Sequence, residues 1–408
     1  MSQKLNRLKY FILMSTSVDN DQKITEENMN TILNLEKTAD SLRKNDIQTY
    51  NIFKHIYTFN SGTGIQIIPN SFKNKVLEYF GHQDPNGKLI ESEHEIIDRI
   101  EHQKIIQIYN QWTGEGALYN SLRAERPKIR GMNLQKEKNY LKNLINESAK
   151  VCDFCNPEKY TPEDIFGRVR GKNSITAANI AKYDVWSSLI IFNTHNPLKF
   201  NLRQFSDYIN TGFEWFKAVN NHSSDFRFPF FMWNCLPRAG ASQVHGHCQI
   251  LMSNKPYAKV KNLRNAYNEY KIKSGENYFN DLHKVHKSLG LAATQDKVHF
   301  FVSLTPIKEK EVVIISPVNP SKSIEVKKTI FNILRCFIDI LDVYSFNLSI
   351  SCPSIINTEE FPYIIRIVDR GRLLNSTADI GGMELYGSSV VSDDPYKVID
   401  VLKSNLSI

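Results

Sequence analysis

One succession of elements, strand, helix, strand, strand, recurs in the last two-thirds of this chain and limits the folds open to it. Apolar periodicity places the first occurrence at residues 185–193, 202–219, 228–235 and 243–252. The second has strands at 299–304 and 311–316, a helix over 326–341 and strands at 346–351 and 363–368. Trp233-Asn234 and Phe346-Asn347 fall at corresponding places. The repetition predicts an α+β fold of two similar halves that pack as an internal pseudo-dimer.

We expect three parts along the chain: a mainly helical N-terminal extension over 1–105, a first domain over 106–255 and a second over 256–408. Within the extension, apolar residues near helical spacing predict helices in 24–45 and 90–112. Ser61-Gly62-Thr63-Gly64 is expected to form a hairpin turn rather than a phosphate loop, because no lysine follows at P-loop spacing. These features indicate a packing or regulatory role for the extension.

Composition narrows the possible functions. The 408 residues carry 51 Lys and Arg against 43 Asp and Glu, and the net charge of +8 suits an anionic ligand but is too small to indicate nucleic acid. No stretch approaches the roughly 18 apolar residues of a membrane span, and no signal peptide is recognisable. Six cysteines without a signal peptide favour a reducing compartment, so we expect a cytoplasmic protein without membrane or nucleic-acid partners.

The densest group of polar residues lies between positions 234 and 249. His245, His247 and Gln249 alternate along a predicted strand, so their side chains share one face. A tight loop with Gly240 and Ser242 precedes the strand, and its small residues let backbone N–H groups approach an oxygen anion. A strand with a solvated polar face is the alternative. Two histidines and a glutamine in register after a Gly-x-Ser turn favour a catalytic site.

Histidine suits nucleophilic attack on phosphorus. Its reference pKa of about 6.5 leaves most imidazole neutral at pH 7.5, whereas a lysine with a pKa of about 10.4 is almost wholly protonated. The phosphoramidate that neutral imidazole forms is a good leaving group in the return step. Ser242 and Gln249 offer neutral hydrogen-bond donors to the phosphoryl oxygens.

Cys152-Asp-Phe-Cys155 is a C-x2-C knuckle of the kind that zinc uses. With no second knuckle, further ligands have to come from distant histidines, and His195 and His245 would complete a closed, structural Cys2His2 set. Two half-buried thiols near a turn are the alternative. Upstream, Arg123 and Arg126 before Pro127 offer a bidentate grip for a diphosphate, with a solvated helix end as the alternative.

In their order along the chain, these residues resemble the galactose-1-phosphate uridylyltransferase branch of the histidine-triad (HIT) superfamily. Its pattern is Arg-x-x-Arg-Pro, Cys-x-x-Cys, a His in a segment like Thr-His-Asn-Pro-Leu, then Asn, Gly-x-Ser and His-x-His-x-Gln. The chain carries every member, namely Arg123, Arg126, Cys152, Cys155, His195, Asn234, Gly240, Ser242, His245, His247 and Gln249. The resemblance covers 120–255 well and the second half loosely. It implies tandem HIT-like domains of antiparallel sheets with flanking helices.

The resemblance also implies a role for each residue. His247 becomes the nucleophile that forms a covalent nucleotidyl-histidine. The resemblance implies that a structural zinc ion is bound by Cys152, Cys155, His195 and His245. It also implies that the phosphoryl groups and the nucleotide are contacted by Gln249, Ser242, Gly240, Asn234, Arg123, Arg126 and Asn179. For Asn179 an ordinary turn is nearly as good an explanation. Glutamine in place of a third histidine is similar to the transferases and phosphorylases, which pass the nucleotide to a phosphate rather than to water.

The second half departs from the uridylyltransferase pattern. Its strand at 361–371 lacks the histidines of those enzymes, although Glu384 lies in a segment similar to their sugar-contacting Gly-x-Glu. Galactose 1-phosphate is therefore in question as the acceptor. Arg366 and Arg370 offer a phosphate site instead, and solvated arginines on an edge strand are the alternative.

The expected activity is transfer of a nucleoside monophosphate by double displacement. A nucleoside-diphosphate sugar, or a dinucleoside polyphosphate, would donate the nucleotide to His247, and inorganic phosphate or a sugar 1-phosphate would accept it. The alternatives are a HIT-type nucleotide hydrolase and a zinc-stabilised nucleotide-binding or regulatory protein without turnover. Either a monomer or a homodimer is compatible with an internal pseudo-dimer.

Overall fold

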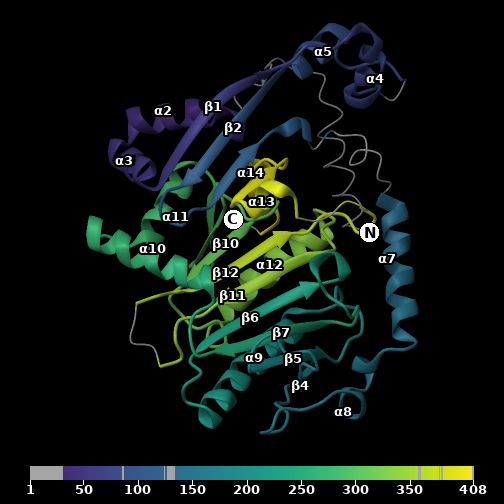
Figure 1. Cartoon of the computed structure of the whole chain (residues 1–408), viewed down its shortest axis with the longest axis vertical. Coiled ribbons are helices and arrows are strands. Elements are labelled where there is room, and N and C mark those ends of the chain that lie inside the picture. The colour runs from purple at the N-terminus through teal and green to yellow at the C-terminus, as the bar shows by residue number, and fades with distance from the viewer. Residues whose placement is uncertain are drawn as a thin grey trace. The chain divides into compact units, whose positions relative to one another are not determined.

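The two repeats share one antiparallel sheet of nine strands. The structure is a computed structural model, which describes residues 31–84, 87–123, 125, 134–356, 360–375, 377 and 380–406. In sheet order the strands are β4 (Ser174–Ala178), β5 (Trp186–Phe192), β7 (His247–Ser253), β6 (Phe228–Cys235), β11 (Phe346–Ser351), β12 (Tyr363–Asp369), β10 (Val312–Ser316), β9 (Val298–Val302) and β8 (Ala292–Gln295). Figure 1 shows them side by side from β10 to β4.

A pseudo-twofold axis passes between β6 and β11, the strands that join the two halves. Asn234 on β6 lies directly opposite Asn347 on β11. Outward from this pair the strand order is β6-β7-β5-β4 on one side and β11-β12-β10-β9 on the other. The α+β pseudo-dimer predicted from the repeated element order is therefore confirmed, and β6 and β11 begin and end at the predicted residues.

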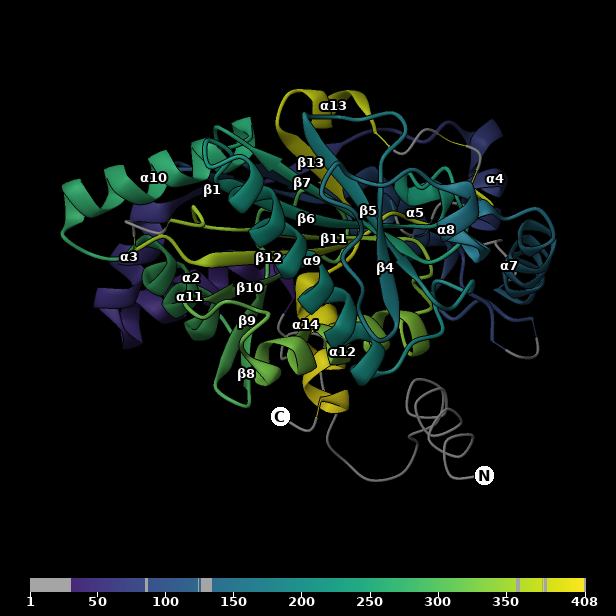
Figure 2. The ribbon, with the colours of Figure 1, turned by 90° about the horizontal axis from the view of Figure 1, so that it is seen from below.

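One face of the sheet is covered by α9 (Leu202–His222) and α12 (Ile324–Asp339), the helices of the two repeats. α9 begins at a capping box, in which Asn201 Oδ1 accepts from the Gln204 backbone N–H and the Gln204 side chain accepts from that of Asn201. Its apolar stripe packs on strand residues such as Phe231 and Ile250. Figure 2 shows α12 and α14 (Pro395–Asn405) on one side of the sheet and α13 (Gly382–Leu385) on the other. Polar strand residues are thereby left on the face opposite α9 and α12.

A second sheet of four strands has the order β1-β2-β3-β13, and two element predictions fail in it. The strands are β1 (Tyr57–Ile65), β2 (His102–Asn110), β3 (Gly116–Tyr119) and β13 (Ser388–Val391). Ser61-Gly62-Thr63-Gly64 forms no turn, because it pairs within β1 against β2. The helix expected over 90–112 ends with α5 (Glu93–Glu101). Ile105 and Ile108 had the spacing of a helix, but Ile106 and Ile108 are the buried alternate residues of a strand.

The remaining helices complete the described part of the chain. They are α2 (Leu35–Asn45), α3 (Ile47–Ile56), α4 (Asn70–Phe80), α7 (Leu134–Ala149), α8 (Pro157–Tyr160), α10 (Ala258–Ser274) and α11 (Tyr278–Ser288). Residues 24–30 of the helix predicted over 24–45 lie outside the described residues. The boundary expected at residue 105 falls inside β2, and the division into 1–105, 106–255 and 256–408 stays a prediction. No helix among the described residues has both the length and the apolar content to cross a bilayer.

Candidate active site and metal centre

Four residues far apart in sequence converge at the end of the first half. Cys152 precedes the short 3-10 turn Asp153–Cys155 and Cys155 ends it, whereas His195 follows β5 and His245 precedes β7. One ligand atom from each residue lies within 4.8 Å of all the others. The sequence expectation that these residues come together is confirmed, and they form a cluster that could hold a metal ion.

The hydrogen bonds around the two histidines orient them toward the cluster. His245 Nε2–H donates to the Phe192 carbonyl at 2.8 Å, so its Nδ1 carries the lone pair and lies 3.3 Å from Cys152 Sγ. His195 Nε2 lies 3.0 Å from Ser148 Oγ, and its Nδ1 lies 3.2 Å from His245 Nδ1. Because Ser148 Oγ donates to the Ile145 carbonyl at 3.1 Å, it accepts from His195 Nε2–H, which leaves the lone pair of His195 on Nδ1. The Nδ1 lone pairs of both histidines therefore lie in the cluster with the two thiols, as in a site whose outer partners fix the tautomers of its ligands.

The chemistry of this donor set fits a soft divalent cation. Burial, reinforced by the neighbouring thiol of Cys155, raises the pKa of Cys152 to about 11, and burial lowers the pKa of His245 to about 4. With both histidines neutral, the cluster itself has no positive charge that would stabilise a thiolate. A bound cation would supply that charge. Two sulfur and two nitrogen donors in a closed set are the ligands that structural zinc uses.

Gly246 lies between His245 of the metal cluster and His247 of β7, at a point where the chain passes close to its neighbours. A Cβ at this position would lie 2.4 Å from Phe192 Cδ2 and 3.2 Å from the Pro197 Cα, so only glycine fits. The Gly246 N–H donates to the His195 carbonyl at 2.9 Å, and the Gly246 carbonyl accepts from Phe192 N–H at 2.9 Å. The segment that carries His195 is thereby fastened to the beginning of β7.

His247 begins β7 and is 96% buried, since only 4% of its surface is exposed. Its Nδ1 lies 2.8 Å from the backbone carbonyl of His245, which fixes the proton on Nδ1 and leaves the lone pair on Nε2. Burial lowers the pKa of His247, so the neutral ring is favoured. The Phe154 ring, from the turn between the two cysteines, packs edge-on against His247 with centroids 5.3 Å apart. The metal knuckle thus also positions the candidate nucleophile.

Gln249 lies on the same face of β7, one alternation beyond His247. Its Nε2 donates to the hydroxyl of Tyr183 at 3.3 Å. Its Oε1 is buried and has no hydrogen-bond partner among the described residues. Tyr183, which is 62% exposed on the loop before β5, was not anticipated from the sequence, because no motif marks it.

The loop before β7 adjoins the pseudo-twofold axis. Gly240 has a φ of 94°, a left-handed conformation that favours glycine. Asn234 Oδ1 accepts from Asn347 Nδ2 at 2.7 Å, and the same amide donates to the Ala239 carbonyl at 3.1 Å. Ser242 is exposed, and no hydrogen bond joins it to His247 among the described residues. Asn234 is therefore linked to the loop through Asn347, whereas the structure gives no role to the Ser242 hydroxyl.

The other residues singled out in the sequence lie at separate places. Arg123 and Glu384 line a cavity of about 610 Å³ whose lining comes mostly from the second half, and Glu384 pairs there with Lys308 at 2.9 Å. Asn179 follows β4, where its Oδ1 accepts from the Ala181 N–H at 3.2 Å, which is the ordinary turn foreseen as the alternative. Arg126 lies outside the described residues.

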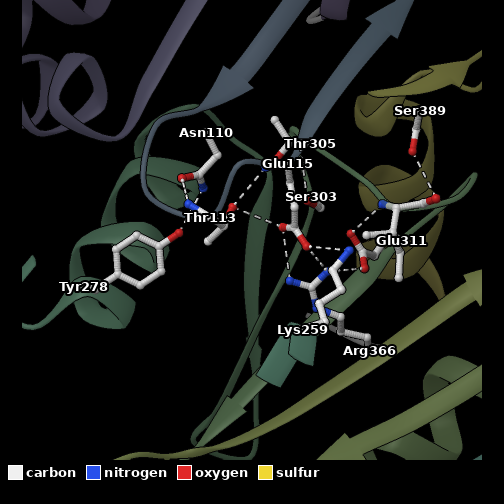
Figure 3. Close-up of polar contacts among 11 residues, drawn as sticks. Asn110, Thr113, Glu115, Lys259, Tyr278, Ser303, Thr305, Glu311, Arg366 and Ser389 are labelled. Carbon is white, nitrogen blue, oxygen red and sulfur yellow. Dashed lines mark hydrogen bonds and ion pairs between the residues drawn. The ribbon is translucent and has the colours of Figure 1, made fainter. Parts of the chain in front are cut away.

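Arg366 belongs to a buried charge network rather than to a solvated edge (Figure 3). β12 lies between β11 and β10, so the edge-strand alternative is wrong. Both guanidinium nitrogens contact Glu115, at 2.9 and 3.2 Å, and Nη1 also contacts Glu311 at 3.1 Å. Burial opposes ionisation of Glu115, but Arg366 and Lys259 outweigh it and lower its pKa, whereas burial raises the pKa of Glu311. The network ties the β2–β3 turn to the second half.

Replacing Arg366 with methionine is expected to destabilise the fold by about 3–5 kcal/mol, because two buried carboxylates lose their shared cation. Lys259, whose side chain is 63% exposed, provides the control: Lys259→Ala should cost less than about 1 kcal/mol. Urea unfolding of the two variants measures both effects. Equal and small losses would show that the network contributes little to stability.

Comparisons with known proteins agree with this geometry at the level of fold. No protein-family model and no curated protein matches the sequence. An ADP-glucose phosphorylase from Arabidopsis thaliana, solved with ADP-glucose bound, matches with a TM-score of 0.56 over 73% of this chain and 98% of that one, at 16% identity. A GalT-like protein from the same plant matches with a TM-score of 0.51 over 62% and 92%, also at 16% identity. A uridylyltransferase matches with a TM-score of 0.50 over 60% and 88%, at 15% identity.

These likenesses show that the chain has the fold of an ADP-glucose phosphorylase, a GalT-like protein and a uridylyltransferase. The fold that the ordered motifs led us to expect is thereby confirmed. At these identities the likeness shows architecture alone, so the chemistry of this chain has to be argued from its own residues.

Proposed function

We propose that this protein transfers a nucleoside monophosphate from a nucleoside-diphosphate sugar, or from a dinucleoside polyphosphate, to inorganic phosphate or a sugar 1-phosphate. The observation that carries the proposal is the buried His247, whose Nδ1 is occupied by the His245 carbonyl so that Nε2 is left as the nucleophile. The similar fold of an ADP-glucose phosphorylase supports phosphate as the acceptor. A hydrolase and a binding protein without turnover are the other outcomes of the tests below.

The reaction proceeds in two displacements at the phosphorus of the nucleotide. His247 Nε2 attacks the α-phosphorus, a P–N bond forms, and the P–O bond to the leaving sugar 1-phosphate breaks. An oxygen of the acceptor phosphate then attacks the same phosphorus, and the P–N bond breaks to return neutral His247. Gln249 N–H groups and the backbone of the Gly240 loop donate hydrogen bonds to the phosphoryl oxygens as charge accumulates on them.

We propose zinc as the ion of the Cys152, Cys155, His195 and His245 cluster. When bound, it supplies a structural cross-link and takes no part in the displacements. Its contribution to catalysis comes through this chain's own residues, because Phe154, between the two cysteines, packs against the ring of His247.

The acceptor is proposed to bind beside Arg370, in the second half. In the β6–β7 ladder Gln249 pairs with Met232, two residues from Asn234, and Arg370 correspondingly meets Ser345, two residues from Asn347. Arg370 is thus the pseudo-twofold counterpart of Gln249. It contacts the Asn347 side chain and lines a cavity of about 230 Å³ that adjoins the larger one containing Arg123 and Glu384. Arginine in this position favours a dianionic phosphate.

Arg370→Ala is expected to raise the KM for the acceptor phosphate at least tenfold and to slow the first displacement by a similar factor. Both displacements are in line with His247 Nε2, so the leaving sugar 1-phosphate and the incoming phosphate occupy the same side of the α-phosphorus and meet the same guanidinium. Arg335→Ala, on α12 across the sheet, is the matched control and should leave both steps unaffected. Unchanged kinetics of both steps in Arg370→Ala would show that neither phosphate binds beside Arg370.

A donor screen tests the proposed function as a whole. UDP-glucose, ADP-glucose, GDP-mannose and diadenosine tetraphosphate are incubated with the purified protein, with and without inorganic phosphate, and the products are separated by ion-exchange chromatography. Phosphate-dependent release of a nucleoside diphosphate is the expected result. Release of nucleoside monophosphate at the same rate without phosphate would identify a hydrolase, and binding without any product would identify a binding protein.

A further inference from the structure

A second cavity, of about 430 Å³, opens in the second half where α11 faces β9, β10 and the beginning of β12. In the sheet, β7 and β10 are separated by β6, β11 and β12, so the cavity lies about 20 Å from His247 at ordinary strand spacing. Its volume is within the range of small-ligand sites, about 300–1,000 Å³. It is therefore distinct from the proposed transfer site and large enough for a compound of nucleoside size.

The walls of this cavity are aromatic and nearly rigid. Phe279, Phe301 and Phe361 line it, and each is more than 95% buried. Phe279 packs against Phe361 at a centroid distance of 5.6 Å and Phe301 against His286 at 4.1 Å, so each ring is held by an aromatic neighbour. Flat aromatic walls of this kind favour a planar ring as the occupant.

Its polar groups are neutral donors and acceptors. His283 and His299 lie with ring centroids 4.6 Å apart, and His283 Nε2 is buried without a hydrogen-bond partner among the described residues. Burial lowers the pKa of His283 to about 4, so the ring is neutral at physiological pH. Asn280 adds an amide at the rim. Neutral imidazoles and amides both donate and accept, which is what the polar edge of a nucleobase requires.

The charges of the described lining residues favour an uncharged ligand over a phosphorylated one. No lysine or arginine is among the described residues that line the cavity. Among the described lining residues the acidic group is Glu360, which is paired with Lys271 at 2.7 Å. The cavity of about 610 Å³ beside the proposed acceptor site differs, because cationic side chains such as Arg123, Arg238 and Arg370 line it.

We propose that this cavity is a second ligand site, which binds an uncharged planar heteroaromatic compound of the nucleoside class against its aromatic lining of Phe279, Phe301 and Phe361. His283 and His299 bond to the polar edge of the base. The site is independent of the proposed transfer reaction and would stand if that reaction were disproved.

The test uses adenosine and uridine, which carry no phosphate, with the full-length protein and isothermal titration calorimetry. At least one nucleoside should bind at a single site, and a saturating concentration of ADP and UDP should leave this binding in place. His299→Ala and Asn280→Ala, at two exposed positions, and His283→Leu should each weaken it at least tenfold. Lys284→Ala, exposed on α11 beside His283 but outside the lining, should not.

Three results would overturn the proposal. The first is that neither nucleoside binds with a dissociation constant of about 1 mM or tighter. The second is displacement by ADP or UDP together with unchanged binding in the cavity variants, which would assign the binding to the transfer face. The third is equal weakening by Lys284→Ala and the cavity variants. Circular dichroism of each variant establishes that the fold is intact, and Asn280→Ala keeps the test decisive if His283→Leu misfolds.

Discussion

His247→Gln is expected to reduce nucleotide transfer by about 10⁴- to 10⁶-fold, the order of magnitude lost when a covalent nucleophile is removed. Glutamine can keep a hydrogen bond to the His245 carbonyl, but it has no lone pair that attacks phosphorus. Steady-state product formation with the donor found in the screen, in the presence of phosphate, measures the loss. The residual rate should not respond to a higher phosphate concentration, because no intermediate awaits the acceptor.

The neighbouring residue provides the control for this variant. Gln249→Ala keeps the nucleophile and removes donors to the phosphoryl oxygens, so a loss of about 10²- to 10³-fold is expected. Metal content and circular dichroism of both variants should match those of the wild type. A His247→Gln protein that retained more than about a tenth of the wild-type rate would place the nucleophile elsewhere.

Loss of the metal is the second large effect that we expect. Cys152→Ser should abolish stoichiometric zinc binding, which we expect at one ion per chain in the wild type. Structural zinc contributes on the order of 10 kcal/mol at such sites, so the Tm should fall by roughly 10 °C or more. Transfer should decrease as well, because Phe154 and the backbone of Gly246 connect the cluster to His247. Metal analysis and differential scanning calorimetry measure the two effects.

Two further variants separate the roles of the metal. Cys352→Ser changes a buried cysteine far from the cluster in sequence and should keep the zinc. Phe154→Ala should also keep the zinc but lower transfer, because it removes only the ring that packs on His247. Zinc retained in both Cys152→Ser and His195→Ala would show that the ligand set is wrong.

The residues of the first half could be predicted because short-range order fixes their geometry. Alternation along one strand places His247 and Gln249 on the same face, and a two-residue spacing brings Cys152 near Cys155. The apolar stripe of α9 likewise follows from helical spacing. These features depend on neighbours within a few residues, which a sequence displays directly.

Features that depend on strand order or on single distant partners were missed. Arg366 was assigned to an edge strand as one alternative, although β12 lies inside the sheet and its partner Glu115 is 251 residues away. Glu115 carries no motif, and neither does Tyr183. The pairing of β1 with β2 could not be predicted either. Ile105 and Ile108 have the i, i+3 spacing of a helix, and the buried alternation of Ile106 and Ile108 becomes recognisable only once the partner strand is known.

The most direct test of the account is the covalent state of His247 when donor is present and acceptor is absent. The protein is incubated with the donor from the screen, quenched in alkali to preserve a phosphoramidate, and analysed by intact mass and peptide mapping. One nucleoside monophosphate per chain, bonded to His247, lost in acid and discharged by inorganic phosphate, is the predicted result. Continued transfer with no adduct, or with an adduct on another residue, would contradict it.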